Sequence, residues 1–163
     1  MKKYYALFFA VVLVDQLSKF ALIKYLPHEA WIAILGEGQG LFNIVHVTNT
    51  GIAFSAFSGY NSFFLFLSFL IVIVTSVWTI LNSAKLTKIQ TAALTLIVSG
   101  GTGNLIDRIF RGAVVDFLDF GIGYTRWPAF NVADSAVCIG AALLVISIIF
   151  QKEGAVSAPK QPK

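Results

Sequence analysis

Charged side chains are scarce in this chain of 163 residues, where they make up only 12% of the sequence. A water-soluble domain is usually about one quarter charged, so these few charges cannot cover a surface that faces water. Hydrophobic residues account for 57% of the chain, and the mean hydropathy is +0.79. The composition therefore excludes an ordinary soluble domain and predicts one polytopic membrane domain over residues 1–152. The polar segment 153–163 is expected to be a disordered tail.

Cysteine and histidine are almost absent. Cys138 is the only cysteine and lies inside an apolar run, which excludes an internal disulfide and leaves a thiol nucleophile without an obvious base. The only histidines are His28 and His46, and no HExxH spacing occurs. We therefore expect no metal site and no cofactor. His46 falls in a stretch with strand character, and we expect it on the surface of that strand.

The formal net charge of +4 indicates topology rather than nucleic-acid binding, because the lysines stand at the ends of apolar runs. With four spans, Arg111 and Arg126 fall on one side, together with Glu29 and Glu37. Seven lysines fall on the other side: Lys2, Lys3, Lys85, Lys88, Lys152, Lys160 and Lys163. The positive-inside rule then places both termini, including the tail, in the cytoplasm.

The four expected spans are residues 4–24, 61–81, 89–107 and 133–150. The stretch 61–81 carries no charge, and as a helix it covers ~30 Å, the thickness of the hydrocarbon core. The start of the chain also fits a cleavable signal peptide. However, Asp15 and Lys19 interrupt its apolar stretch and no small-x-small cleavage site follows, which favours a retained helix.

Two segments, 26–58 and 109–131, are too broken for spanning helices and are expected outside the membrane. The stretch LFNIVHVTN at 41–49 alternates well enough to be a strand. In NTGIAF, which follows, Gly51 permits a tight turn and Asn49 can cap a turn or bind through its amide.

Polar residues inside the expected helices need a reason. Asp15 and Lys19 are four apart, share a helix face and can pair, either as a structural salt bridge or as part of a site. The third span contains Gly100, Gly101 and Gly103, followed by Asn104. This cluster permits close helix contact; a phosphate-binding loop would also need a preceding strand and a Lys-Ser/Thr ending, which are missing.

The stretch from Val114 to Asp134, VVDFLDFGIGYTRWPAFNVAD, carries three of the eight acidic residues and precedes the last apolar run. Placing carboxyl groups at the end of a membrane helix costs free energy. The presence of Asp116 and Asp134 there therefore suggests acid–base chemistry. Two carboxyl groups held together share one proton. The ionised group can then activate a water molecule, while the protonated group donates its proton to the reacting group. The rival acids are Asp119 and Asp107, and Asp107 is expected in a structural ion pair with Arg108 or Arg111.

The predicted geometry brings these groups to one depth. Asn104 and Lys19 lie at similar heights on their helices, and Asp134 begins the fourth helix at the outer surface. Asp116 is expected in the loop just before that helix. Polar residues from three helices and a loop therefore meet near the outer leaflet boundary.

Five stretches together resemble the lipoprotein signal peptidases, the type II signal peptidases of bacteria. They are DQLSK at 15–19, NTGIAF, GGTGNLIDR at 100–108, VVDF and FNVAD, and they occur in the family's order across residues 15–140. The resemblance implies an all-α polytopic membrane protein with four transmembrane helices and a small extracytoplasmic β-cradle, which suits residues 40–54. It also implies the bacterial cytoplasmic (inner) membrane as the location.

The resemblance implies an aspartyl endopeptidase that cleaves the signal peptide of prolipoproteins just before a diacylglyceryl-modified cysteine. Asp116 and Asp134 then correspond to the catalytic dyad. The substrates carry lipobox signal peptides, membrane lipids surround the enzyme, and globomycin-type cyclic peptides inhibit the family. The positions that line or brace the site in the matching motifs are Asp15, Lys19, Asn49, Gly51, Gly103, Asn104, Arg108, Asn131 and Ala133.

Two other classes of protein remain open from the residues alone. A small channel or proton-coupled transporter also places acids in a helix bundle, although usually near the midplane and within internal repeats. A structural subunit of a larger complex could use Asp15 and Lys19 for assembly alone.

Overall fold

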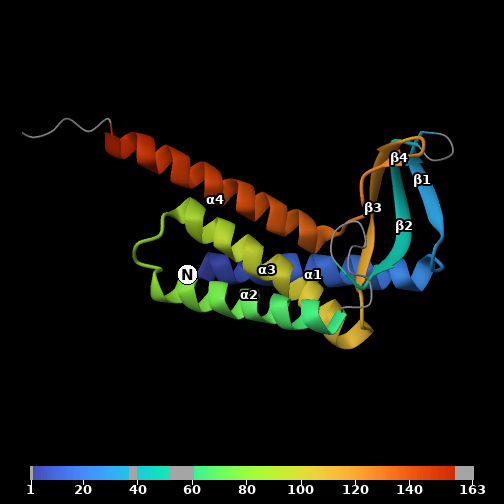
Figure 1. Ribbon diagram of the computed structural model, residues 1–163, viewed down its shortest axis with the longest axis horizontal. Coiled ribbons are helices and arrows are strands. Elements are labelled where there is room, and N and C mark those ends of the chain that lie inside the picture. The colour runs from blue at the N-terminus through green and yellow to red at the C-terminus, as the bar shows by residue number, and fades with distance from the viewer. Residues whose placement is uncertain (1, 37–39, 52–60, 157–163) are drawn as a thin grey trace, which may run out of the picture.

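The computed structural model of the protein describes residues 2–36, 40–51 and 61–156. Four of the described helices are long and apolar enough to cross a membrane: α1 (Lys2–Tyr25), α2 (Asn61–Leu81), α3 (Lys88–Arg111) and α4 (Val132–Val156). In Figure 1 they run along the long axis of the molecule, and a small sheet lies at one end. The fold expected from the sequence, a mostly helical polytopic membrane protein with a small sheet, is confirmed.

The expected spans match these helices with differences at their ends. Helix α3 continues to Arg111 rather than ending near residue 107. Helix α4 continues to Val156, so residues 153–156, which were expected to begin a disordered tail, are helical. The remainder of that tail, residues 157–163, lies outside the described part of the chain.

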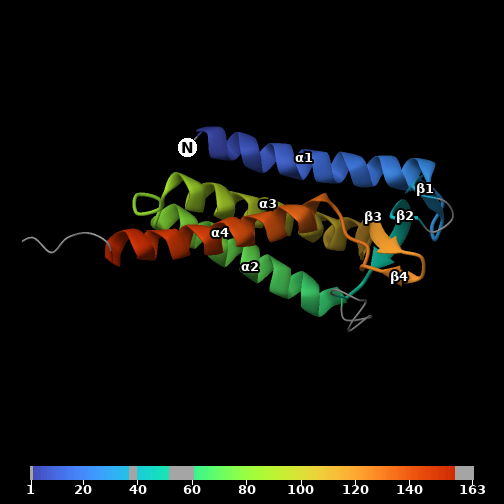
Figure 2. The same ribbon diagram turned by 90° about the horizontal axis from the view of Figure 1, so that it is seen from above.

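Helix α3 is the centre of the bundle. It packs against α1, α2 and α4, and Figure 2 shows α1 and α2 on opposite sides of it. A capping box between Thr87 and Gln90 fixes its start, with each side chain bonded to the other's backbone N–H. Its contact with α4 is close: a Cβ added at Gly100 would lie 2.3 Å from the carbonyl oxygen of Ala133. Any larger residue there would separate the two helices.

The outward surfaces of the helices are apolar. Large side chains such as Phe9, Phe66 and Ile80 are more than half exposed on α1 and α2. In water such an extended apolar surface would drive association, whereas the bilayer core solvates it. The exposed side chains therefore face lipid, and the polar residues are turned inward.

The sheet has four strands in the order β1-β2-β3-β4: β1 (Trp31–Leu35), β2 (Phe42–Asn49), β3 (Val114–Ile122) and β4 (Thr125–Arg126). All neighbouring strands are antiparallel. The strand expected from LFNIVHVTN is β2, and of the cradle expected over 40–54, residues 52–54 lie outside the described part. The sheet is fixed to α1 by a buried cluster of Leu22, Leu26, Val115 and Phe117.

Two expectations about the sheet were wrong. Asp116 lies in β3 rather than in a loop, because residues 114–122 pair with β2. His46 is buried rather than on the surface, and its Nδ1 lies 2.8 Å from the carbonyl oxygen of Leu26 at the end of α1. This hydrogen bond satisfies both polar groups at the junction of sheet and helix.

Candidate active site

Asp116 and Asp134 are joined by one residue, Asn131. The side-chain Nδ2 of Asn131 donates to Asp116 Oδ1 at 2.7 Å, and its backbone N–H donates to Asp134 Oδ2 at 3.2 Å. Asn131 Oδ1 in turn accepts the backbone N–H of Asp134 at 2.9 Å. Asn131 is thus the N-cap of α4 with Asp134 at the third helical position, a reciprocal capping arrangement. The start of α4 therefore sets the positions of both carboxyl groups.

Each carboxyl group has a second amide donor. Asn49 Nδ2 donates to Asp116 Oδ2 at 3.2 Å from the end of β2. Asn104 Nδ2 donates to Asp134 Oδ1 at 2.7 Å from α3. Both carboxyl groups are thereby oriented by neutral amides, with no direct salt bridge to either among the described residues.

The environment of Asp116 changes its acidity. Burial, and after it the negative charge of Asp134, raise the pKa of Asp116, which lies at about 7. The hydrogen bonds from Asn49 and Asn131 act against this increase, because they stabilise the ionised form. Asp116 therefore exchanges a proton near neutral pH, which an exposed carboxyl group cannot do.

A buried ion cluster lies behind the two carboxyl groups. Lys19 Nζ donates to Asp15 Oδ2 at 2.9 Å, to Asp107 Oδ2 at 2.7 Å and to Asn104 Oδ1 at 3.0 Å. The side chains of the lysine and both aspartates are fully buried. All three ammonium protons have acceptors, so the charge is paired and hydrogen-bonded, as a buried charge requires.

This cluster connects three helices. Asp15 Oδ1 accepts the backbone N–H of Ala133 at 2.9 Å, which joins α1 to the start of α4. Gly103 leaves room for the same carboxyl group, since a Cβ there would lie 2.6 Å from Asp15 Oδ2. Asp15 and Lys19 thus form the expected pair and also hold the helix that carries Asp134.

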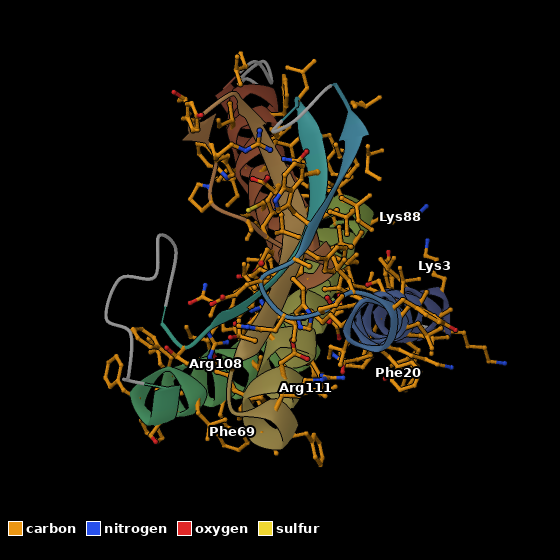
Figure 3. The ribbon with its side chains drawn as sticks, turned by 90° about the vertical axis from the view of Figure 1, so that its right-hand side faces the viewer. Lys3, Phe20, Phe69, Lys88, Arg108 and Arg111 are labelled. Atoms are coloured by element: carbon orange, nitrogen blue, oxygen red, sulfur yellow. The ribbon has the colours of Figure 1, made fainter. Side chains whose placement is uncertain are left out.

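The expected ion pair of Asp107 with Arg111 is present, whereas its second partner, Lys19, was not expected. Arg108 donates instead to the carbonyl oxygen of Gly51 at 3.1 Å. Figure 3 shows Arg108 where the end of β2 approaches α2. Gln16 was missed: its Nε2 lies within 3.1 Å of acceptors on Asp15 and Asp107. An uncharged polar residue within an apolar helix was the available signal.

Two open cavities meet the site from different directions. The sheet-side cavity, of about 470 Å³, is lined by Asp116, Asn49 and residues 127–129 among others. The helix-side cavity, of about 290 Å³, lies between α2, α3 and α4 and is lined by Asp134, Asn104, Arg108 and Cys138 with apolar neighbours. Asp116 thus borders one cavity and Asp134 the other. The two carboxyl groups therefore lie between the two cavities.

The fold and these polar residues define a multi-pass membrane protein with paired carboxyl groups at one end of a four-helix bundle. Residues 7–150 match the peptidase family A8, described as signal peptidase (SPase) II. The chain therefore belongs to the signal peptidase II family, and so to the peptidases.

Relatives and solved structures agree with this assignment. The lipoprotein signal peptidase of Borrelia hermsii (strain HS1 / DAH) is 43% identical over 152 residues, covering 88% of each chain. That of Nitratidesulfovibrio vulgaris (strain DP4) is 39% identical over 144 residues, covering 86% of each chain. A bacterial membrane enzyme solved by the in meso method at 2.3 Å superimposes with a TM-score of 0.85 at 28% identity. That match covers 100% of this chain and 96% of the other.

Proposed function

We propose that the protein is an aspartyl endopeptidase of prolipoproteins in which Asp116 and Asp134 form the catalytic dyad. It cleaves the signal peptide immediately before the diacylglyceryl-modified cysteine. The family and the names of the relatives support the substrate class. The observation that carries the mechanism is the bridge through Asn131, which donates one hydrogen bond to each carboxyl group.

In this mechanism the dyad holds one proton, and Asp116, whose pKa is about 7, carries it at rest. The Asp134 carboxylate removes a proton from a water molecule as the water oxygen attacks the scissile carbonyl carbon. Asp116 donates its proton to the carbonyl oxygen. When the tetrahedral intermediate collapses, the C–N bond breaks, Asp134 gives its proton to the leaving amine, and one hydroxyl proton of the intermediate returns to Asp116. The net reaction consumes one water and needs no metal or cofactor.

The two cavities suggest how the substrate lies. The helix-side cavity opens between membrane helices and suits the signal peptide and the lipid of the modified cysteine. The sheet-side cavity suits the chain that follows the cleavage site. Arg108 Nε is buried without an acceptor among the described residues, so a substrate carbonyl oxygen can supply one. Globomycin-type cyclic peptides compete for the same space.

The proposed location is the bacterial cytoplasmic (inner) membrane, with both termini in the cytoplasm and the dyad near the outer leaflet. The lysine asymmetry supports this orientation. It is tested in a Cys138→Ser background with Lys85→Cys in the α2–α3 connection. An impermeant thiol reagent added outside intact cells should fail to label this cysteine, and labelling would reverse the proposed orientation.

The dyad is tested with purified Asp116→Asn, Asp134→Asn and the double variant on a synthetic diacylglyceryl lipopeptide. Each single variant should lose nearly all cleavage and still bind a globomycin-type inhibitor, because asparagine keeps the shape of the side chain. The double variant should be scarcely worse than either single variant, since half a dyad cannot perform both proton transfers.

The matched control is Asp119→Asn, in which the second acidic residue of β3 is changed. It should retain a substantial part of the cleavage, since this carboxylate accepts Arg126 Nη2–H at 2.6 Å rather than belonging to the dyad. Chelators should have no effect, because the described residues contain no group of three potential metal ligands. Full activity in either dyad variant, or zinc-dependent recovery after chelation, contradicts the proposal.

A further inference from the structure

The sheet-side cavity continues into a smaller cavity of about 140 Å³ against β1. The two share four lining residues, namely Val45, Val47, Asp119 and Arg126. The smaller cavity is also lined by Glu29, Trp31 and Asn43, which lie on or beside β1 and β2. It therefore extends the sheet-side cavity from Asp116 across β2 toward β1.

Asn43 contributes an unused acceptor to this cavity. Its side chain is only 2% exposed, and its Nδ2 donates to Asp119 Oδ2 at 2.9 Å. This donation fixes the orientation of the amide, so Oδ1 must be the free end. Among the described residues no group donates to Asn43 Oδ1. A buried acceptor without a donor is costly and marks a place that a ligand group can fill.

Glu29 contributes a negative charge from an unusual backbone conformation. Its φ is +64°, and it is the only described residue other than glycine with a positive φ. Such conformations persist where neighbouring structure imposes them, and they cluster at ligand sites. Here the backbone N–H of Glu29 donates to the carbonyl oxygen of His46 at 2.8 Å, which holds the turn against β2.

Arg126, the one cation among the described residues that line this cavity, is already bonded to other groups. Arg126 donates from Nε and Nη2 to the Asp119 carboxylate at 3.1 and 2.6 Å, and from Nη1 to the carbonyl oxygen of Gly40. The arginine and aspartate charges therefore offset each other. What the cavity offers to a ligand is the Asn43 acceptor and the Glu29 carboxylate.

We propose that Glu29 and Asn43 form a subsite for a cationic side chain of the substrate, on the product side of the cleavage site. The proposal rests on the function proposed above. Asn43 pairs with Asp119 across β2 and β3, and Asp119 is three residues beyond Asp116 along β3, which corresponds to about 10 Å at the rise of a strand. An extended substrate covers this distance with three residues. The subsite therefore receives the side chain two positions after the lipid-modified cysteine, the third residue counted from the cleaved bond.

The test uses diacylglyceryl lipopeptides that differ only at that third residue, which is lysine, norleucine or glutamate. Norleucine retains the length of lysine without the ammonium group. At low salt kcat/KM should be about fivefold higher for lysine than for norleucine, as expected for a partly exposed ion pair, and lower still for glutamate. The preference should weaken as salt is added.

Three variants test whether Glu29 and Asn43 cause this preference. Glu29→Gln should reduce the lysine-to-norleucine ratio to near one, and Glu29→Lys should reverse the order so that glutamate becomes the better substrate. Asn43→Ala should reduce the ratio in part; because it also loses the bond to Asp119, its folding is checked by inhibitor binding. The control is Lys24→Gln, a change of one charge unit at the exposed end of α1, which should leave the ratio unchanged.

The outcomes separate the two proposals. If the wild-type protein cleaves no lipopeptide, the proposed function fails. If it cleaves all three peptides equally, or if Glu29→Lys does not reverse the preference, the subsite is refuted while the peptidase stands. An equal change of the ratio in Lys24→Gln also overturns the subsite, since it would reflect the overall field of the protein.

Discussion

Replacement of Lys19 by methionine is expected to destabilise the protein strongly. Methionine matches the length of lysine but removes the ammonium group that donates at 2.9, 2.7 and 3.0 Å to Asp15, Asp107 and Asn104. Two fully buried aspartates then face each other, and Arg111 remains as the only cation paired with the cluster among the described residues. Removing one partner of a buried ion pair costs about 3–5 kcal/mol.

The size of the effect is tested by unfolding in mixed micelles, followed by tryptophan fluorescence and by globomycin binding. The Lys24→Met variant is the control, because Lys24 lies exposed near the end of the same helix. It should change the free energy of unfolding by less than about 0.5 kcal/mol. The double variant Lys19→Met/Asp15→Asn should be less damaged than the sum of its single changes, since it restores neutrality. A loss below about 1 kcal/mol in Lys19→Met, or simple additivity, would refute this account of the cluster.

Three further predictions concern the dyad and its packing. Because Asp116 has a pKa of about 7, cleavage should fall as pH rises through 7. Asn49→Ala removes a hydrogen bond that lowers this pKa, so the alkaline limb of the pH–rate profile should move to higher pH. An alkaline limb that does not move contradicts the assignment of this pKa to Asp116. The raised pKa means that Asp116 contributes most to stability at low pH and loses this contribution as pH rises toward 7. Asp116→Asn should therefore exceed the wild type in melting temperature at pH 8, and the gain should shrink toward pH 5. Gly103→Ala should cost about 1–3 kcal/mol of unfolding free energy, because its Cβ would lie 2.6 Å from Asp15 Oδ2, and a melting temperature equal to that of the wild type would contradict the close approach.

The helices and the meeting of polar residues could be predicted from sequence because their signals are local. An apolar run of about 20 residues specifies a membrane span by its length alone. The spacing of four between Asp15 and Lys19 predicts their pairing on one helix turn, and the structure has that pair at 2.9 Å. The shared depth of Lys19 and Asn104 follows from helix rise, and the two side chains are hydrogen-bonded.

The sheet partners could not be predicted in the same way, because they join distant parts of the chain. Asn49 and Asp116 are 67 residues apart, and no periodicity in either segment specifies that β2 pairs with β3. A second feature of the sheet could not be predicted either. Residues 116 and 119 of a regular strand face opposite sides, yet both line the sheet-side cavity. Between them, the backbone N–H groups of Phe117 and Leu118 both donate to the carbonyl oxygen of Phe130, at 3.0 and 2.8 Å, which is the pattern of a bulge in β3 and interrupts the alternation of its side chains.

The roles of Asn131 show why stability and chemistry are coupled in this fold. The hydrogen bonds that cap α4 are the same bonds that orient Asp134, and the remaining amide N–H orients Asp116. Asp15 fixes the same helix end through Ala133, and Asp15 is held by Lys19. The buried ions therefore act on the dyad through the position of α4 and through Asn104, which accepts a hydrogen bond from Lys19 and donates one to Asp134. A substitution in this cluster should consequently lower turnover in the molecules that still fold. A substitution confined to the lipid-facing surface should lower neither turnover nor stability.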